Sequence, residues 1–210
     1  MGTFFLNDFD NMEKFYRAKF INSLSGIKSA NLVGTIDKNG QTNLSIASSV
    51  VHIGANPALM GLIFRPATVP RHSFENIKDT GWFTLNHVGK SFFKKAHQSS
   101  ARYEKETSEF DAVGLEDEFI DGISAPFVKN SSLKIGLKLR EVIHLGINKT
   151  EFVIGEVICV DVSENHIEKD GYIDIESLST VGVTGLDAYH EIKKPTRLSY
   201  AKPGQLIKEI

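Results

Sequence analysis

The residues from Arg65 to Ser73 have the chemistry of an anion site. Arg65 directly follows an apolar run, so its guanidinium is expected to emerge at the end of a strand. Guanidinium groups offer planar, paired donors to phosphate, and a serine opening a helix adds its hydroxyl and the helix dipole. The loop therefore predicts a phosphate site formed by four candidates, Arg65, Arg71, His72 and Ser73. The alternative interpretation is a surface loop whose arginines pair with nearby carboxylates, Glu75 or Asp79.

A second stretch, residues 43–49, is rich in small polar side chains. It contains Asn43, Ser45, Ile46, Ala47, Ser48 and Ser49. A strand that packs only against protein usually carries larger side chains, whereas small ones let a flat ring approach the backbone. Hydroxyl and amide groups can then meet the polar edge of such a ring. This pattern indicates a heteroaromatic ligand, and the alternative is an edge strand with polar outer positions.

These two stretches need a framework of strands to bring them together. Hydrophobic alternation and turn signals predict strands over residues 30–36, 42–53, 59–64, 82–88, 133–143 and 151–162, with an Asn-Gly hairpin turn at 37–40. Helices are expected over 12–24, 73–79, 91–100 and 108–114, with Asp10 and Ser73 as N-caps and Gly81 and Gly114 as helix ends. The tail, residues 189–204, is expected to wrap the surface. Strands and helices do not alternate strictly, so a mostly antiparallel barrel with peripheral helices is favoured over a parallel sheet.

Composition narrows the functional class. The 210 residues carry a net charge of −2, which gives no basic field for nucleic acid. No apolar run approaches the roughly 18 residues that span a bilayer, and the N-terminus lacks the features of a signal peptide. One cysteine, Cys159, excludes an internal disulfide and a cysteine metal cluster. We therefore expect a cytoplasmic protein with no nucleic-acid or membrane partner.

Several motifs fail on inspection. Gly89-Lys90-Ser91 resembles the end of a P-loop, but Thr84 stands where the motif needs glycine. The seven histidines show no metal-ligand spacing, so no metal site is expected. His87 and His190 could assist proton transfer, but the sequence gives no geometry to support either, so no catalytic residue is named.

Taken together, the stretches resemble the flavin reductase-like domain family, whose members include flavoredoxin-like, FMN-binding split barrels. The matching segments are residues 29–36, 43–49, 64–80, 81–86, 99–111 and 154–157. The resemblance implies one split-barrel domain over 1–210, antiparallel and Greek-key-like, with its core at about 20–195 and a tail at 196–210. Many relatives carry Lys-Asp-Thr where this chain has Arg71-His72-Ser73.

The same resemblance implies a homodimer with FMN at its interface. Residues 43 and 45–49 would lie along the ring and ribityl chain, and Arg65, Arg71, His72 and Ser73 toward the phosphate. Ser100 and Tyr189 are further cofactor candidates.

The implied activity is an FMN-binding oxidoreductase of the flavin reductase type. It would transfer hydride from NADH or NADPH through FMN to a flavin or another small-molecule acceptor. An alternative is an FMN-binding electron carrier or storage protein without its own NAD(P)H reaction. A third interpretation keeps the barrel but binds haem or pyridoxal phosphate. Haem would need an axial histidine, and His52 or His144 could serve only by coincidence.

Overall fold

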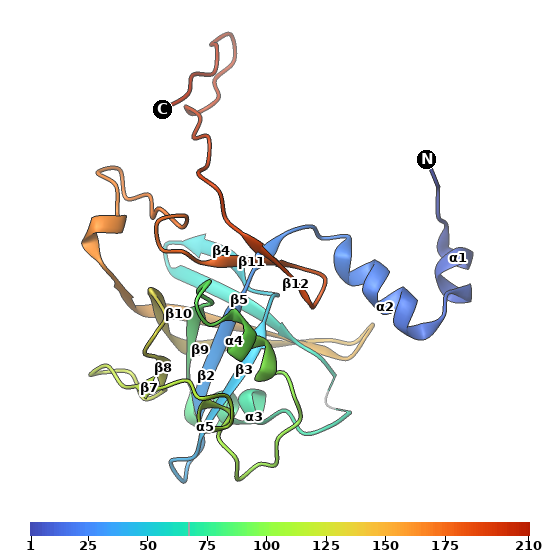
Figure 1. Cartoon of the computed structure of the whole chain (residues 1–210), viewed down its shortest axis with the longest axis vertical. Coiled ribbons are helices and arrows are strands. Elements are labelled where there is room, and N and C mark those ends of the chain that lie inside the picture. Colours follow the sequence, from blue (N-terminus) through green and yellow to red (C-terminus); the bar gives the residue numbers. More distant parts are fainter. Residues whose placement is uncertain (67) are drawn as a thin grey trace.

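A seven-stranded antiparallel sheet is the centre of the computed structural model, which describes residues 1–66 and 68–210. Along the sheet the strand order is β3-β2-β6-β9-β10-β5-β4 (Figure 1). The strands are β2 (Asn31–Ile36), β3 (Thr42–Ala47), β4 (Val51–Ala55), β5 (Ala58–Phe64), β6 (Trp82–His87), β9 (Leu133–Leu145) and β10 (Thr150–Val162). Consecutive strands β5 and β6 are separated in space by β9 and β10, so the connection is Greek-key-like. The predicted mostly antiparallel sheet is confirmed.

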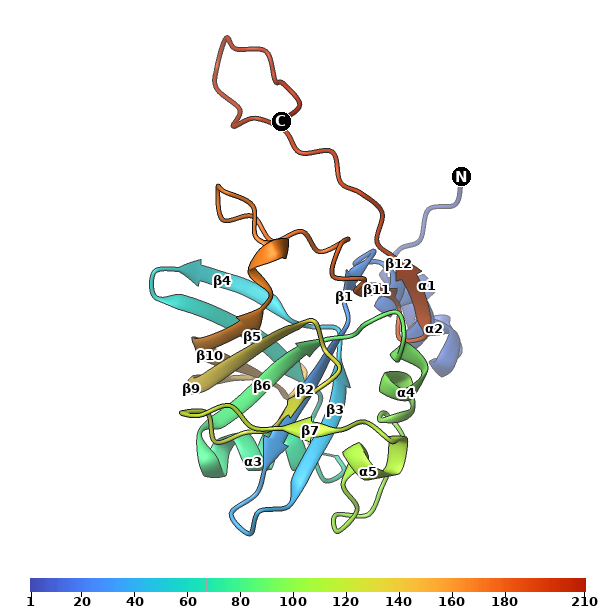
Figure 2. The ribbon, with the colours of Figure 1, turned by 60° about the vertical axis from the view of Figure 1, so that its left-hand side comes forward.

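Irregularities in the long strands curve the sheet into a barrel. The β9–β10 pairing shifts register between Ile154 and Gly155 and again between Val157 and Cys159. Such bulges bend a strand and increase its twist. At Gly155 on β10 an added Cβ would lie 2.6 Å from the ring of Phe83 on β6, so glycine leaves the room that this ring occupies. Figure 2 shows the strands wrapping around the barrel interior.

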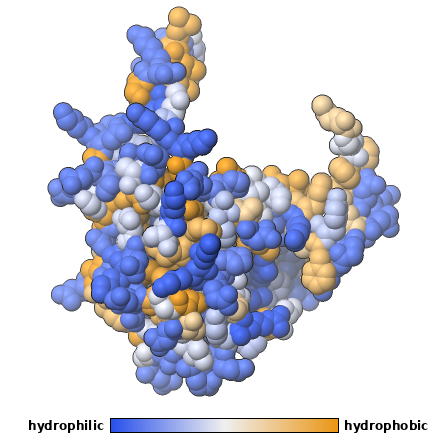
Figure 3. Space-filling view, in the orientation of Figure 1, coloured by the Kyte–Doolittle hydropathy of each residue, from blue (hydrophilic) through white to orange (hydrophobic). Residues whose placement is uncertain are grey.

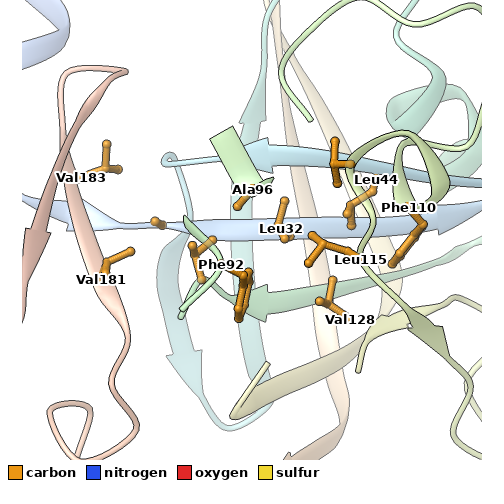
Figure 4. Close-up of a cluster of buried hydrophobic side chains, with 12 residues drawn as sticks. Leu32, Leu44, Phe92, Ala96, Phe110, Leu115, Val128, Val181 and Val183 are labelled. Atoms are coloured by element: carbon orange, nitrogen blue, oxygen red, sulfur yellow. The ribbon is translucent and has the colours of Figure 1, made fainter. Parts of the chain in front are cut away.

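Hydrophobic side chains form one cluster on each side of β2. Val33 faces the barrel interior with Phe83, Leu137 and Val153. Its neighbour Leu32 points the other way, as successive residues in a strand must. That outer cluster fills the space beneath the helices that follow β6; it includes Leu32, Leu44, Phe92, Phe110 and Val128 (Figure 4).

Short helices and small sheets surround the barrel. The helices are α1 (Leu6–Asn11), α2 (Lys14–Ser23), α3 (His72–Thr80), α4 (Phe93–Gln98), α5 (Glu109–Val113) and a 3-10 turn at Glu164–His166. One small sheet joins β1 (Lys28–Ser29), β11 (Val181–Thr184) and β12 (Ala188–Glu191), and another joins β7 (Asp117–Glu118) and β8 (Phe127–Val128). Gly81 and Gly114 end α3 and α5 in the left-handed conformation, as predicted.

Three local predictions are wrong. The expected strand over 42–53 is two strands, because the chain turns at residues 48–50 and the Ser49 hydroxyl bonds the backbone of Ile63 at 3.1 Å. The expected helix over 12–24 begins at Lys14 and is capped by the carboxylate of Glu13, not by Asp10. Ser73 is not an N-cap, since α3 begins one residue earlier.

The prediction that residues 189–204 wrap the surface is also wrong. Tyr189 belongs to β12, and the following segment extends away from the barrel instead of wrapping it (Figures 1 and 2). Its end folds back on itself, since Ser199 N donates to the Lys208 carbonyl and Ile210 N to that of Arg197. The small sheet of β1, β11 and β12 was not predicted, because its strands are only two to four residues long.

Candidate functional site

A cavity of about 1320 Å³ lies beside β3, β5, α3 and the loops flanking α4. Every residue predicted from the sequence to bind the cofactor lines it. These residues are Asn43, Ser45, Ile46, Ala47, Ser48, Ser49, Arg65, Arg71, His72, Ser73, Ser100 and Tyr189. Ala67, in the predicted phosphate loop, lies outside the described residues. The fold thus brings together residues 43–49 and 65–73, which β4 and β5 separate in the sequence.

The wall formed by β3 and α3 is a network of short polar side chains. The Asn43 amide donates to Ser73 Oγ at 2.7 Å, and the hydroxyls of Ser45 and Ser73 share a hydrogen bond at 2.8 Å. Asn43 and Ser73 are both buried. Ser73 lies in the first turn of the nine-residue α3, whose N-terminus carries partial positive charge. The arrangement offers hydroxyls and free backbone N–H groups to an anion.

Three arginines gather at this end of the cavity. Burial lowers the pKa of Arg71, and the positive charges of Arg65 and Arg102 lower it further. Arg71 Nε is buried without a hydrogen-bond partner within residues 1–66 and 68–210. Like charges held together around an orphaned donor are the arrangement expected where an anion binds.

The carboxylates suggested as alternative partners form no ion pair with these guanidiniums among the described residues. Asp79 lies 3.4 Å from Lys38 Nζ, and Glu75 Oε1 accepts a long 3.4 Å hydrogen bond from the backbone N of Arg71. Across the described part of the chain, no ion pair involves Arg65, Arg71 or Arg102. This geometry favours the phosphate interpretation of the loop over the surface interpretation.

A buried carboxylate supports β3 from α5. Glu109 accepts a hydrogen bond from the backbone N of Leu44 at 2.8 Å, while the Ser108 hydroxyl bonds that of Thr42 at 2.8 Å. Burial raises the pKa of Glu109, and the Leu44 N–H and nearby His72 partly offset that rise. Since β3 is an edge strand, these contacts hold the cavity wall in place.

The opposite wall comes from α4 and β12. The Tyr189 hydroxyl lies 3.1 Å from His97 Nδ1, and its ring packs against Phe93 with centroids 5.2 Å apart. Burial raises the pKa of Tyr189, and nearby Asp187 adds to the rise. Ser100 donates its hydroxyl to the His97 carbonyl at 2.7 Å, so that hydroxyl is held within its own turn.

Sequence reasoning missed several lining residues. Those with polar or exposed side chains include Arg102, Lys105, His97, Glu109, Leu186 and Asp187. Arg102 had a usable signal, because it follows the serines of a segment already matched to the family. His97 and Asp187 had none, since only the β11–β12 hairpin brings them to Tyr189.

Two histidines considered for proton transfer are not part of this site. Neither His87 nor His190 is among the described residues lining the cavity. Burial lowers the pKa of His87 to about 4, and His190 Nε2 hydrogen-bonds the Thr184 hydroxyl at 2.8 Å. Within the described residues there is also no cluster of three or more potential metal ligands.

The cavity combines a wall of small polar residues with a guanidinium cluster and an orphaned buried donor. The sequence matches the flavin reductase like domain over residues 27–177. The chain belongs to the flavin reductase-like domain family. The family predicted from the sequence is confirmed.

Solved structures agree with this assignment. One is a protein from Shewanella frigidimarina that is assigned as a flavin reductase with a split barrel domain. It is 54% identical to this chain, with a TM-score of 0.92, and the match covers 96% of this chain and 100% of that one. Nitrilotriacetate monooxygenase component B from Bacillus cereus is 22% identical with a TM-score of 0.83, covering 94% of this chain and 98% of that one. Flavoredoxin of Desulfovibrio vulgaris is 23% identical with a TM-score of 0.70, and the match covers 85% of this chain and 92% of that one. The predicted split-barrel fold is therefore confirmed.

The family and the fold indicate the general functional class of this protein, a flavin-associated oxidoreductase. In the part of the chain that the structure describes, none of the helices has the length and hydrophobicity needed to span a bilayer.

Proposed function

We propose that this protein is an FMN-dependent oxidoreductase of the flavin reductase type. It takes hydride from NADH or NADPH and passes the electrons to a flavin or another small acceptor. The observation that carries the proposal is the cavity that joins the small polar wall of β3 to the guanidiniums of Arg65, Arg71 and Arg102, which form no ion pair with the described residues. The relative that is 54% identical over almost the whole chain supports the same activity class.

The protein's own residues have separate tasks in this proposal. Arg65, Arg71 and Arg102 bind the phosphate, with Ser73 and the N-terminus of α3 completing its shell. Ser45 and Ser48 line the ring and ribityl chain, where small side chains leave the backbone accessible. Tyr189 and His97 form the opposite wall. When bound, FMN supplies the hydride chemistry, and the protein provides orientation and shielding from water.

The size of the cavity supports a second reactant beside the cofactor. Pockets for one drug-sized ligand measure about 300–1000 Å³, and this cavity measures about 1320 Å³. We therefore propose that nicotinamide and acceptor reach the ring through the same opening. The proposal requires no general acid from the protein, because the hydride chemistry belongs to the cofactor.

The proposal includes a homodimer with FMN at its interface, as the family resemblance implies. It also treats the chain as one split-barrel domain with its core at about 20–195 and a tail at 196–210. A cytoplasmic location and the absence of nucleic-acid partners stay predictions from the sequence.

The deciding experiment is an absorbance spectrum of the purified protein, before and after anaerobic addition of NADH or NADPH. A reductase shows flavin bands that bleach on addition. Bands that persist with both nucleotides contradict the reductase and favour the carrier. No flavin bands after incubation with FMN and desalting would overturn the flavin proposal itself.

A further inference from the structure

The first 27 residues form an arm that packs against almost nothing. Helices α1 and α2 contain six and ten residues, and neither has a buried residue. Isolated helices of this length are marginal in water and depend on tertiary packing. The arm projects sideways from the barrel, with apolar side chains visible on its surface (Figures 1 and 3).

The arm has internal order, so it is more than a loose terminus. Phe20 contacts the rings of Phe4, Phe9 and Tyr16, with centroids 5.2–6.4 Å apart. The carboxylate of Glu13 caps α2 through two backbone N–H groups. A pre-formed arm loses less conformational entropy on docking, which favours binding.

The large apolar side chains of the arm face solvent. Eight of them are between 43% and 72% exposed: Phe4, Phe5, Leu6, Phe15, Tyr16, Ile21, Leu24 and Ile27. With aromatic side chains burying 150–250 Å² each, these eight residues present roughly 900 Å² of surface. A stable protein interface buries about 800 Å² per partner, so the arm alone offers enough for one.

A second apolar surface lies at the far edge of the main sheet. Strand β4 is the last strand in the order, and Val51 and Ile53 on it are 47% and 39% exposed. Ile63 on the adjoining β5 is 36% exposed. An edge strand with exposed apolar side chains is normally covered. The arm and β4 lie apart in both views, so the chain does not cover this edge with its own arm (Figures 1 and 2).

Both surfaces border the candidate cavity. Asn22, near the end of α2, and Ile63 both line it. The arm is anchored there because Lys28 Nζ donates to the carbonyls of Asn22 at 3.0 Å and Gly185 at 3.3 Å. Exposed lining residues, such as Arg65 and Leu186, leave the cavity open to solvent in a single copy.

We infer that the arm of one copy docks on the β4–β5 edge of a second copy. Each copy carries both surfaces, so a two-fold pairing covers both arms and both edges at once. Because both surfaces border the cavity, each partner closes the open side of the other's site. This inference rests on the homodimer of the proposed function, and it does not depend on which cofactor binds.

The first test is the solution mass of the full chain and of matched variants by sedimentation equilibrium. The wild type is expected at twice its 23.3 kDa chain mass. Phe15→Glu with Tyr16→Glu, on the arm, and Ile53→Glu, on the edge, are each expected to give monomers. Ile147→Glu is the control, because Ile147 is 98% exposed in the β9–β10 turn and belongs neither to the arm nor to β4 or β5. Circular dichroism checks that each variant is folded.

The second test asks whether the arm meets β4. Chains carrying Phe15→Cys are mixed with chains carrying Ile53→Cys, all with Cys159→Ser, and treated with a short bis-maleimide. Covalent dimers should form several-fold faster than in the matched mixture with Ile147→Cys. A monomeric wild type, a dimer that survives the arm substitutions, or equal cross-linking in both mixtures would each overturn the inference.

Flavin binding separates this inference from the proposed function. A monomeric wild type that retains flavin bands contradicts the docking of the arm and leaves the flavin proposal intact. A dimer that depends on the arm but shows no flavin bands supports the docking and contradicts the flavin proposal. If both hold, the dissociated variants should bind FMN about tenfold more weakly, since a ligand held between two copies and their association are reciprocally coupled.

Discussion

The side-chain amide of Asn43 donates a hydrogen bond to Ser73 Oγ at 2.7 Å, which ties β3 to the first turn of α3. Asn43 belongs to the proposed ring wall and Ser73 to the proposed phosphate shell. The two halves of the site are therefore joined by a buried contact that exists in the protein alone. Because Ser45 also bonds Ser73 Oγ at 2.8 Å, one serine hydroxyl fixes the relative positions of strand and helix.

Replacing Ser73 with alanine should destabilise the fold. The substitution leaves the buried Asn43 amide without its acceptor, which costs about 1–3 kcal/mol. Urea unfolding, followed by far-ultraviolet circular dichroism, measures this loss. Ser25→Ala is the control, since Ser25 is exposed and its hydroxyl makes only a long 3.5 Å contact with the Asn22 carbonyl. Equal unfolding midpoints for the two variants would contradict the structural role of Ser73.

Replacing Arg65 with alanine should weaken FMN far more than riboflavin, which lacks the phosphate. Loss of one charge-assisted contact costs about 2 kcal/mol, or about thirtyfold in affinity. Titration of the apoprotein, followed by quenching of flavin fluorescence, gives both dissociation constants. Arg140→Ala serves as the control, because Arg140 pairs with Glu156 on strands that do not line the cavity. If the affinities for FMN and riboflavin fall equally, Arg65 does not contact the phosphate.

The parts of the fold that the sequence predicted are those with strong local signals. Asp37 shows this at the first hairpin, because its carboxylate accepts from the backbone N–H groups of Asn39 and Gln41 as the turn sequence suggests. Gly81 likewise ends α3 at a left-handed position that few other residues adopt. The site residues were found for a similar reason, since the residue types in two short stretches, 43–49 and 65–73, indicated a ring and a phosphate as ligands.

What was missed depends on contacts between distant segments. Ser73 looks like an N-cap in sequence, but tertiary bonds to Asn43 and Ser45 hold it inside the helix instead. Tyr189 was assigned to a tail, because pairing of β12 with β11 cannot be read from four residues. The two exposed surfaces of the arm and β4 also have no local signal, since exposure is a property of the folded chain.

Replacing Ser48 with leucine should weaken FMN and riboflavin alike. Ser48 lines the cavity, and a leucine there fills space that the ring needs. Overfilling a packed site typically costs about 1–3 kcal/mol, which corresponds to roughly five- to hundredfold in affinity. Ser48→Ala is the matched variant, because it removes the hydroxyl and adds no volume. If alanine and leucine weaken binding equally, the hydroxyl matters and the space does not.

His87 should make the fold less stable as the pH falls below neutrality. Burial lowers the pKa of His87 from 6.5 to about 4, so the unfolded chain binds a proton more readily than the folded one. Stability is therefore complete above pH 6.5 and is lost as the pH falls from 6.5 through about 4. Between pH 7.5 and pH 5 this single group should account for about 2 kcal/mol of lost stability.

The measurement is urea unfolding of the wild type and His87→Gln at both pH values. The variant cannot take up that proton, so its loss between the two pH values should be smaller by about 2 kcal/mol. The comparison uses the change with pH, so any constant cost of the substitution cancels. His52→Gln, at an exposed histidine on β4, should follow the wild type. Parallel losses in wild type and His87→Gln would show that His87 is accessible to protons in the folded state.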